Sequence, residues 1–383
     1  MIYFYKDKKI NFLRYPRTTN KSLRAWNTAD EYILNHLENE KLDKKQIAIY
    51  NDRFGFLSSM LHDYNPIIVN FHKSQERAIV RNLENNSINY ENFQFLTPIE
   101  YPSKKSDIVV VKIPKTLNLF RYYLQHLTKN LKKNSTVICS FMTKHFSKQM
   151  LQIADEYFED ITQSLAWKKS RLLILKKPKT YIERDLVENL VVDENLTLKQ
   201  YPGVFSADHI DPATRFLLDT ISIRVKDKVV LDLGCGNGIL GRSVHEDNSK
   251  AELHLLDDYF LAVESAKLNI SGKNVHFHYN DNLKIFDNNY FSLVISNPPF
   301  HFDHENNIEV SIDLFKHVAR ILSEKGRFVL VANQHLNYRT HLEKYFNQVE
   351  DLAENEKYII YECKNISETE TDLDEDDDTR FNI

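Results

Sequence analysis

Closely spaced glycines follow a strongly apolar stretch in the second half of the chain. In Val229–Gly241 (VVLDLGCGNGILG) the apolar stretch ends at Asp232, and Gly234, Gly236 and Gly238 follow at alternate positions. Glycines at a strand-to-helix turn adopt positive φ and let a ligand approach the backbone closely. The run predicts a nucleotide-type ligand at the carboxyl edge of a parallel sheet. A plain tight turn uses the same residues, so the run alone leaves both interpretations open.

Two carboxylates follow the glycine run, at the ends of the next two apolar stretches. Asp257 ends AELHLLD, 25 positions after Asp232, and Asp281 follows NVHFHYN. A carboxylate at the first place can accept hydrogen bonds from both ribose hydroxyls, with Asp258 beside it as the alternative. One at the second place can accept a proton of an adenine amino group. The spacing G-x-G-x-G also differs from the dinucleotide pattern G-x-G-x-x-G, which disfavours an NAD-dependent dehydrogenase.

The tetrapeptide Asn297-Pro298-Pro299-Phe300 follows the next apolar stretch, FSLVIS. With the glycine run and the two carboxylates, it resembles class I S-adenosylmethionine-dependent methyltransferases, in the subgroup that methylates amino groups conjugated to a π-system. Such an amine is a poor nucleophile, and an Asn oxygen and a backbone carbonyl can each accept one of its N–H groups. Proline removes competing N–H donors and fixes φ. Phe300 can stack on a flipped base.

The resemblance extends over about residues 12–364. The chain resembles bacterial rRNA (guanine-N2)-methyltransferases of the RsmC/RlmG family in the segments SNPPFH and YPGVFSADHIDPATRFLL and in its duplicated first half. The first half is closest to the RlmG type, in RYPRT…LRAWNTADEYIL, NDRFGFLS, VKIPKTL and LAWKKSRL. The resemblance implies methylation of N2 of a guanosine in 23S rRNA, position 1835 by the family name, whereas the RsmC branch modifies 16S rRNA. An acidic tail after Lys364 departs from the family.

Carried over by position, the resemblance implies two groups of site residues. The cofactor S-adenosylmethionine would be bound by Asp232, Gly234, Gly236, Asn237, Gly238, Asp257 and Asp281. The target amine would be held by the catalytic residues Asn297, Pro298 and Phe300. Ahead of the glycine run, Asp211-Pro212-Ala213-Thr214 is typical of a plain helix N-cap. Phe205 and Ser206 can line the mouth of the pocket.

Several alternatives remain open from the residues alone. The same chemistry can act on a 16S rRNA guanine, on adenine N6 of a nucleic acid or on a protein glutamine amide. An RNA-binding module without catalysis would not need the motifs that the second half keeps. No metal is expected, because methyl transfer needs none and the cluster His301, Asp303, His304 and Glu305 lacks a ligand spacing.

The elements that must position these residues form an α/β pattern. Short apolar stretches alternate with amphipathic ones in both halves, which predicts two tandem class I (Rossmann-like) methyltransferase domains. The segment IAIYNDRFGFLS has the same place in the first half as VVLDLGCGNGILG has in the second. Gly55 lies 59 positions before Pro114, and Gly238 lies 59 positions before Asn297. The halves therefore look like a duplication. The first copy has lost the glycines and the Asn-Pro-Pro, so it is degenerate and the second binds the cofactor.

The charge of the chain divides in the same way. The 383 residues carry a formal charge of −4, but residues 1–180 hold 30 Lys and Arg against 17 Asp and Glu, a net charge of +13. We expect a degenerate domain over 1–180 that binds rRNA and a connecting segment over 181–200. A catalytic domain over 201–364 and an acidic, disordered tail over 365–383 follow. The chain has only 3 Cys, and the sequence shows no signal peptide and no apolar run of ~20 residues. We therefore expect a soluble cytoplasmic protein without membrane contact. The oligomeric state is open, and a monomer is plausible.

Overall fold

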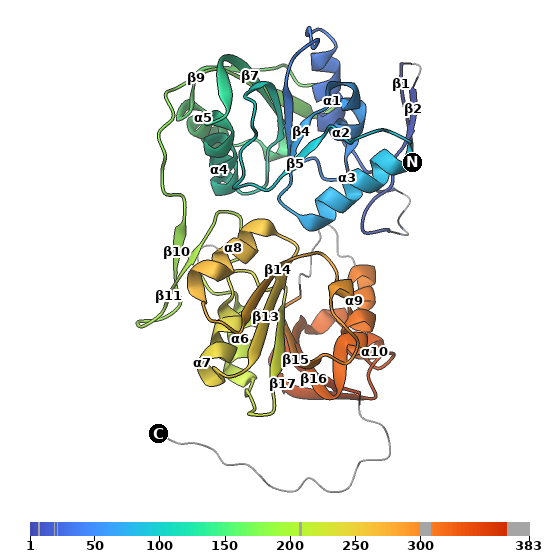
Figure 1. Cartoon of the computed structure of the whole chain (residues 1–383), viewed down its shortest axis with the longest axis vertical. Coiled ribbons are helices and arrows are strands. Elements are labelled where there is room, and N and C mark those ends of the chain that lie inside the picture. Colours follow the sequence, from blue (N-terminus) through green and yellow to red (C-terminus); the bar gives the residue numbers. More distant parts are fainter. Residues whose placement is uncertain (7, 19, 21, 207–208, 299–307, 366–383) are drawn as a thin grey trace, which may run out of the picture.

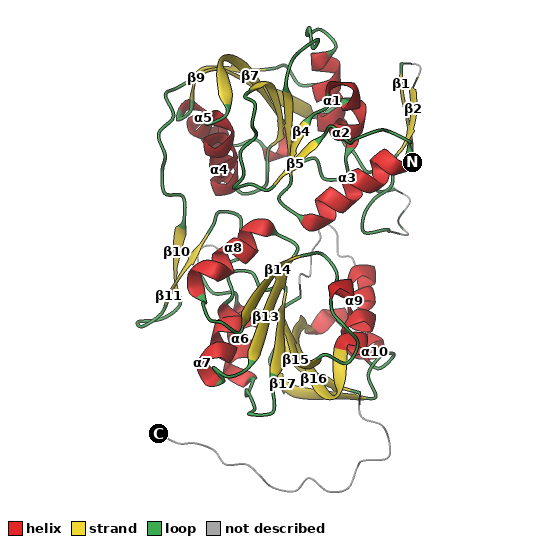
Figure 2. Cartoon of the chain, in the orientation of Figure 1, coloured by secondary structure: helices red, strands yellow, loops and turns green. Residues whose placement is uncertain are grey.

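Each half of the chain builds a seven-stranded sheet that helices cover on both faces (Figures 1 and 2). The computed structural model describes residues 1–6, 8–18, 20, 22–206, 209–298 and 308–365. Pro299, Phe300 and the acidic tail, on which sequence predictions were made, lie outside the described residues. The two tandem α/β domains predicted from the sequence are confirmed.

The first sheet has the strand order β5-β4-β3-β6-β7-β9-β8. Pairing is parallel from β5 to β7 and antiparallel for β7 with β9 and for β9 with β8. The strands are β3 (Ile47–Tyr50), β4 (Ile67–Val69), β5 (Gln94–Leu96), β6 (Ser106–Lys112), β7 (Leu131–Met142), β8 (Phe158–Gln163) and β9 (Ser170–Pro178). The helices are α1 (Thr28–Leu37), α2 (Phe56–Met60), α3 (Lys73–Asn85), α4 (Leu117–Thr128) and α5 (Lys148–Asp155). A hairpin of β1 (Ile2–Tyr5) and β2 (Lys8–Asn11) precedes them.

The second sheet has the order β14-β13-β12-β15-β16-β18-β17. Its strands are β12 (Val229–Leu233), β13 (Glu252–Asp257), β14 (Val275–Tyr279), β15 (Phe291–Ser296), β16 (Leu322–Asn333), β17 (Gln348–Glu354) and β18 (Tyr358–Lys364). The helices are α6 (Pro212–Thr220), α7 (Ile239–Asp247), α8 (Phe260–Asn269), α9 (Ile308–Ile321) and α10 (Arg339–Leu342). The connecting segment contains a hairpin of β10 (Glu188–Val191) and β11 (Thr197–Gln200). Single 3₁₀ turns are η1 (His62–Tyr64), η2 (Thr143–His145), η3 (Leu283–Ile285) and η4 (Gln334–Leu336).

The central strands of both sheets are buried on both faces. All four residues of β3 are buried, and so are four of the five residues of β12. Strands covered by helices on both sides need continuous apolar runs, because neither face meets water. This is why IAIY and VVLDL could be recognised as strands in the sequence. Among the described residues, no helix is both long enough and apolar enough to span a membrane.

The two domains repeat one plan down to single residues. Strand for strand, the two sheets have the same order. Each first strand leads to a helix capped by a left-handed glycine, Gly55 with φ 80° and Gly238 with φ 84°. In the first domain Asn51, with φ 63°, stands where Gly234, with φ 75°, stands in the second. The predicted duplication therefore accounts for both sheets and for the turns that follow their first strands.

The equivalent loops of the two domains pair with each other. The N–H of Lys73, the first residue of α3, donates to the carbonyl of Asp258 at 2.9 Å. The N–H of Phe260, the first residue of α8, donates to the carbonyl of Phe71 at 2.8 Å. Between these bonds the His72 and Tyr259 rings stack with centroids 4.8 Å apart. The domains thus meet through matching segments related by an approximate two-fold axis.

An apolar cluster continues this contact across the interface. Leu261 and Ala262 of α8, with Tyr259 and Val204, belong to the same buried cluster as residues of the first domain's sheet, α4 and α5. Figure 1 shows α8 facing the first domain from the top of the second. Burial of apolar surface is the main favourable term in association, so the two domains are held firmly at the carboxyl end of β13.

Candidate active site

The turn between β12 and α7 leaves two glycines facing open space. Gly234 and Gly236 have φ of 75° and 55°, which L side chains rarely adopt. A Cβ atom built on either glycine would meet no heavy atom within 4 Å. The N–H of Gly234 donates to the carbonyl of Leu256 at 2.8 Å, which ties the turn to β13. The residues present therefore fit a cofactor that lies directly on the backbone.

The other predicted residues of the glycine run have different surroundings. Asp232 is fully buried, and its Oδ2 accepts the N–H of Gly241 at 2.8 Å. It therefore satisfies a backbone N–H group in the first turn of α7. Burial raises the pKa of Asp232 to about 7. Gly238 packs against α8, and neither residue lines the cavity described below. Asn237 does line it, and its Nδ2 donates to Gln200 Oε1 at 2.8 Å.

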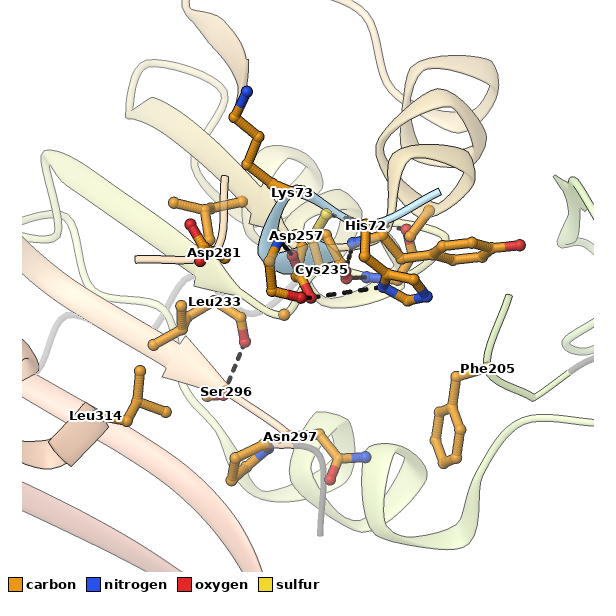
Figure 3. Close-up of a pocket in the computed structure, with 18 of the residues that line it drawn as sticks. His72, Lys73, Phe205, Leu233, Cys235, Asp257, Asp281, Ser296, Asn297 and Leu314 are labelled. Carbon is orange, nitrogen blue, oxygen red and sulfur yellow. Dashed lines mark hydrogen bonds and ion pairs between the residues drawn. The ribbon is translucent and has the colours of Figure 1, made fainter. Parts of the chain in front are cut away.

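Asp257 stands at the carboxyl end of β13 beside the glycine turn (Figure 3). Its Oδ2 accepts the N–H of Gly236 at 2.9 Å, and its Oδ1 accepts the N–H of Tyr259 at 2.8 Å. Burial raises the pKa of Asp257 to about 6, although both hydrogen bonds favour the charged form. The carboxylate is thus held rigidly at the cavity wall and is ionised at neutral pH.

Asp281 is held by the first domain. The Tyr15 hydroxyl donates to Asp281 Oδ2 at 2.7 Å, and Arg77 Nε lies 2.5 Å from Oδ1. Arg77 also donates from Nη2 to Asn280 Oδ1 at 3.1 Å. Only 4% of the Asp281 side chain is exposed. The residue predicted to meet adenine is therefore oriented by two side chains from the other half of the chain.

Asp258, the alternative ribose residue, is part of the interface. Its Oδ1 accepts the N–H of Ser74 and its Oδ2 the Ser74 hydroxyl, both at 2.6 Å. His72 Nδ1 lies 3.5 Å from Oδ2. Burial alone would raise the pKa of Asp258, but the hydrogen bond and charge of His72, the charge of Arg53 and the Ser74 hydroxyl together lower it to about 2. Asp258 therefore bonds across the domain interface, whereas Asp257 bonds to backbone N–H groups of its own domain beside the open glycine turn, so Asp257 is the better placed of the two for a ligand.

Asn297 directly follows β15, next to β12 in the sheet. Its Nδ2 donates to Asp211 Oδ2 at 3.0 Å and to Thr214 Oγ1 at 2.8 Å. Asp211 also caps α6 by accepting the N–H of Thr214 at 3.0 Å, so the cap has a second role that the sequence interpretation missed. Because the amide nitrogen donates both its N–H groups inside the protein, Oδ1 is the end suited to a substrate.

A single cavity of about 1700 Å³ joins these residues. Pro298 lines this cavity. Phe205 and Ser206 line it too, as predicted from the sequence. The Phe205 side chain is 66% exposed and lies across the cavity from Asn297 in Figure 3. Phe300 lies outside the described residues.

The first domain supplies part of the cavity wall, which sequence reasoning missed. The lining residues from this domain include cations and partners of the two aspartates, namely Tyr15, Arg17, His72, Lys73, Ser74, Arg77 and Arg81. Their only signal in the sequence is the net positive charge of residues 1–180. No local pattern connects Tyr15 or Arg77 to Asp281, which lies more than two hundred positions later.

At the matching place in the first domain, the residues contact other parts of their own domain. Asn51 Nδ2 donates to the carbonyl of Lys112 at 3.0 Å, at the end of β6. Lys112 Nζ in turn lies 3.0 Å from Asp30 Oδ1 on α1. Arg53 stands opposite Gly236 in the duplicated plan and donates to Ser74 Oγ at 3.0 Å. The first copy has therefore replaced an open ligand site with internal contacts.

Comparisons with known proteins agree with this division. Residues 2–180 match the family described as RLMG N-terminal domain, and residues 195–362 match the methyltransferase small domain. The "Ribosomal RNA large subunit methyltransferase G" of Aliivibrio fischeri is 32% identical over 93% of this chain and 96% of its own length. The protein of that name from Vibrio parahaemolyticus is 30% identical over 93% and 95%.

A solved structure shares the fold of the whole chain. The "16S rRNA N2 G1207 methyltransferase (RsmC)" of T. thermophilus superposes with a TM-score of 0.72, at 19% identity over 95% of this chain and 97% of that one. The resemblance read from the sequence is confirmed. With both domains matched and relatives above 30% identity along nearly its full length, the chain belongs to the ribosomal RNA large subunit methyltransferase G family.

Proposed function

We propose that this chain transfers a methyl group from S-adenosylmethionine to the exocyclic N2 amine of a guanosine in 23S rRNA. Membership of the family supports the reaction and the RNA, because the relatives are named large subunit rRNA methyltransferases. The observation that carries the proposal is the fixed amide of Asn297. Asp211 and Thr214 hold its nitrogen, which presents its oxygen as an acceptor.

An exocyclic amine has two N–H groups, and the site offers an acceptor for each. Asn297 Oδ1 accepts one, and a backbone carbonyl of the Asn-Pro-Pro-Phe segment accepts the other. Pro298 has no N–H that could compete for these acceptors. Bound S-adenosylmethionine supplies an electrophilic methyl group. Holding the amine in line with it contributes most of the catalysis. The nitrogen bears a positive charge once it has taken the methyl group, so its N–H proton is acidic and passes to water without a strong general base.

The cofactor is proposed to lie along the edge formed by β12, β13 and β14. Gly234, Gly236 and Asn237 face its amino acid end, Asp257 accepts its ribose hydroxyls and Asp281 accepts from its adenine amino group. Asp232 and Gly238 belong to the same predicted set, and we assign them the indirect role of shaping the turn.

RNA is proposed to bind on the first domain and to reach the cavity between the domains. Four cations of this domain line that cavity: Arg17, Lys73, Arg77 and Arg81. Cations neutralise phosphates and release counterions, so they give affinity without sequence preference. In this proposal residues 1–180 bind RNA, 181–200 connect, 201–364 catalyse and 365–383 form an acidic tail. The enzyme then works in the cytoplasm, where rRNA is made.

Methyl transfer to isolated nucleic acids tests this proposal. The chain and radiolabelled S-adenosylmethionine are incubated separately with 23S rRNA, 16S rRNA, DNA and a glutamine-containing release factor. We expect label in 23S rRNA alone, recovered as N2-methylguanosine after digestion. Label only in 16S rRNA, in DNA or in protein would contradict the proposal and identify the alternative acceptor.

A further inference from the structure

Three histidines and a glutamate gather on one face of the second sheet, outside the proposed active site. Glu252 and His254 lie on β13, and His276 and His278 lie on the edge strand β14. Residues two apart on a strand project from the same face. His254 stands directly opposite His276 in the parallel register. The four side chains are therefore brought together by the sheet itself.

Three of these side chains have the separations of metal ligands. His254 Nε2 lies 3.2 Å and His276 Nε2 lies 3.5 Å from Glu252 Oε1, and the three ligand atoms all lie within 4.8 Å of one another. Zinc bonds of about 2.0–2.1 Å in a tetrahedron set ligand atoms roughly 3.3 Å apart. Two of the separations already match this value, and imidazole nitrogen with carboxylate oxygen is a common donor set for zinc.

The outer contacts of the cluster are also those of a metal site. The second ring nitrogen of a metal-binding histidine is usually hydrogen-bonded, which fixes the ring. His254 Nδ1 lies 2.9 Å from His278 Nε2, and the Tyr290 hydroxyl donates to Glu252 Oε1 at 3.1 Å. His254 is only 6% exposed, and its contact with His278 helps to hold the ring in one orientation.

Hydrogen bonds from neutral imidazoles to Glu252 are the competing explanation. His254 Nε2 lies 3.2 Å from Glu252 Oε1, and a ring that carries its proton on Nε2 can donate to this oxygen. In that arrangement the His254 and His276 rings, with centroids 4.8 Å apart, both approach one carboxylate oxygen without a metal ion. The zinc titration below separates the two explanations.

We propose that Glu252, His254 and His276 bind one Zn²⁺ ion, with water in the fourth position. The ion ties the edge strand β14 to β13 and so stabilises the wall that carries Asp281. Glu252 precedes Asp257 by five residues, which separates the ion from the ribose end of the proposed site by about 16 Å along the strand. The proposal is independent of the methyl-transfer reaction.

Zinc binding to the full, untagged chain tests the proposal. After treatment with a chelator, the chain is titrated with ZnCl₂ by calorimetry at pH 7.5, and its Tm is measured with and without Zn²⁺. The variants are His276→Asn and Glu252→Gln, whose native side chains are about two-fifths exposed and can be changed without opening the core. The matched control is His145→Asn, an exposed histidine of the first domain.

We expect one Zn²⁺ per chain and a higher Tm in its presence. Each ligand variant should weaken binding by more than the ~10–100-fold that loss of an outer-shell partner typically causes, and should lose the Tm increase. His145→Asn should keep both. A double variant, His301→Asn with His304→Asn, checks the other histidine-rich segment. Three results would overturn the proposal. They are no saturable binding by the native chain, unchanged binding in both ligand variants, and loss of binding only in the double variant.

Discussion

Asn297 has its amide nitrogen fixed at one end and its oxygen available at the other. Asn297→Ala removes the acceptor and should lower kcat by about 10²–10³-fold, the range for loss of one preorganised hydrogen bond at a reacting group. The Kd for S-adenosylmethionine, measured by calorimetry, should stay within about twofold. A variant that methylates rRNA at the original rate would show that Asn297 does not hold the amine.

Asp257 gives the cofactor site a pH dependence in the mildly acidic range. Burial raises the pKa of this carboxyl to about 6, so it is charged at pH 7 and becomes protonated as the pH falls through 6. A protonated carboxyl accepts fewer hydrogen bonds from ribose, so cofactor affinity should weaken by about tenfold between pH 7 and pH 5. Calorimetric titrations at pH 5, 6, 7 and 8 measure this loss.

Asp257→Asn is the control for that dependence. The amide does not titrate, so the variant should bind the cofactor more weakly at pH 7 and with nearly constant affinity from pH 8 to pH 5. A wild-type affinity that is flat over this range would contradict the assigned role of Asp257.

The sequence predicted which residues reach the cavity where a local motif comes with a clear apolar run. Asp257 ends such a run and Asn297 directly follows one, and both line the cavity. Asp232 belongs to the same motif, but its side chain is fully buried and accepts the N–H of Gly241 instead of lining the cavity. Tyr15 was not predictable, since its contact with Asp281 depends on how two domains dock.

Helix α3 reaches across the interface and carries Arg77 to Asp281. Arg77→Met keeps the length of the side chain and removes the charge, so Asp281 loses a partner that orients it. Removing one partner of a nearly buried charge pair is costly, which predicts about a tenfold or greater rise in the Kd for S-adenosylmethionine without RNA present.

Arg81→Met is the matched control, one turn further along α3 and lining the same cavity. It should leave cofactor binding unchanged, because no contact with Asp281 is assigned to it. Equal effects of both variants would attribute the loss to the general charge of the helix rather than to the contact with Asp281.

Strands β16 and β18 of the second sheet carry a buried ionic network. Arg327, 3% exposed, lies 2.7 Å from Asp227 and 3.0 Å from Glu362. Removing one partner leaves buried charges without compensation, so Arg327→Met should reduce the free energy of unfolding by about 3–5 kcal/mol. Urea unfolding measures it. Arg339→Met, which breaks a more exposed pair with Asp351, should cost no more than about 1 kcal/mol.

Predictability followed burial only in part. Buried parallel strands such as β3 and β15 read as apolar runs and were recognised from the sequence, and so was β14, although all five of its residues are half-buried. The antiparallel strands β8 and β17 were not, because they mix half-buried and exposed positions and carry several charges. Strand β17 has three acidic side chains among its seven residues, so its sequence gives no clear apolar run.

The charge of the whole molecule separates the two tasks of the chain. Residues 1–180 carry +13, and some of that charge lines the cavity between the domains. The double variant Arg17→Ala with Arg81→Ala should weaken rRNA binding and lower the slope of log K against log salt by about 2 if each side chain meets one phosphate. Filter binding at several salt concentrations measures the slope.

Lys104→Ala with Lys105→Ala is the matched pair, equal in charge and absent from the cavity lining. It should change the slope less than the cavity pair does. A larger effect of the lysine pair would place the path of the RNA on another face of the first domain.

The arrangement of the domains was only partly accessible from the sequence. The repeated strand order and the shared spacing of 59 positions predicted two copies of one plan, and the two sheets have that plan. The amino-acid sequence has no pattern that predicts how the two domains dock, because the central hydrogen bonds of the interface join backbone atoms at Lys73 and Phe260. Backbone contacts of this kind are compatible with many side chains.

That paired loop has an evolutionary consequence. Two copies that touch through the same segment in opposite directions have the geometry of a symmetric homodimer whose subunits were later joined into one chain. In such an ancestor each subunit would have contacted the loop that follows the second strand of its neighbour's sheet. After fusion, the first copy kept this contact while its glycine turn diverged. The first domain is then a permanently tethered subunit, and deleting it would remove half of a dimer interface rather than an accessory.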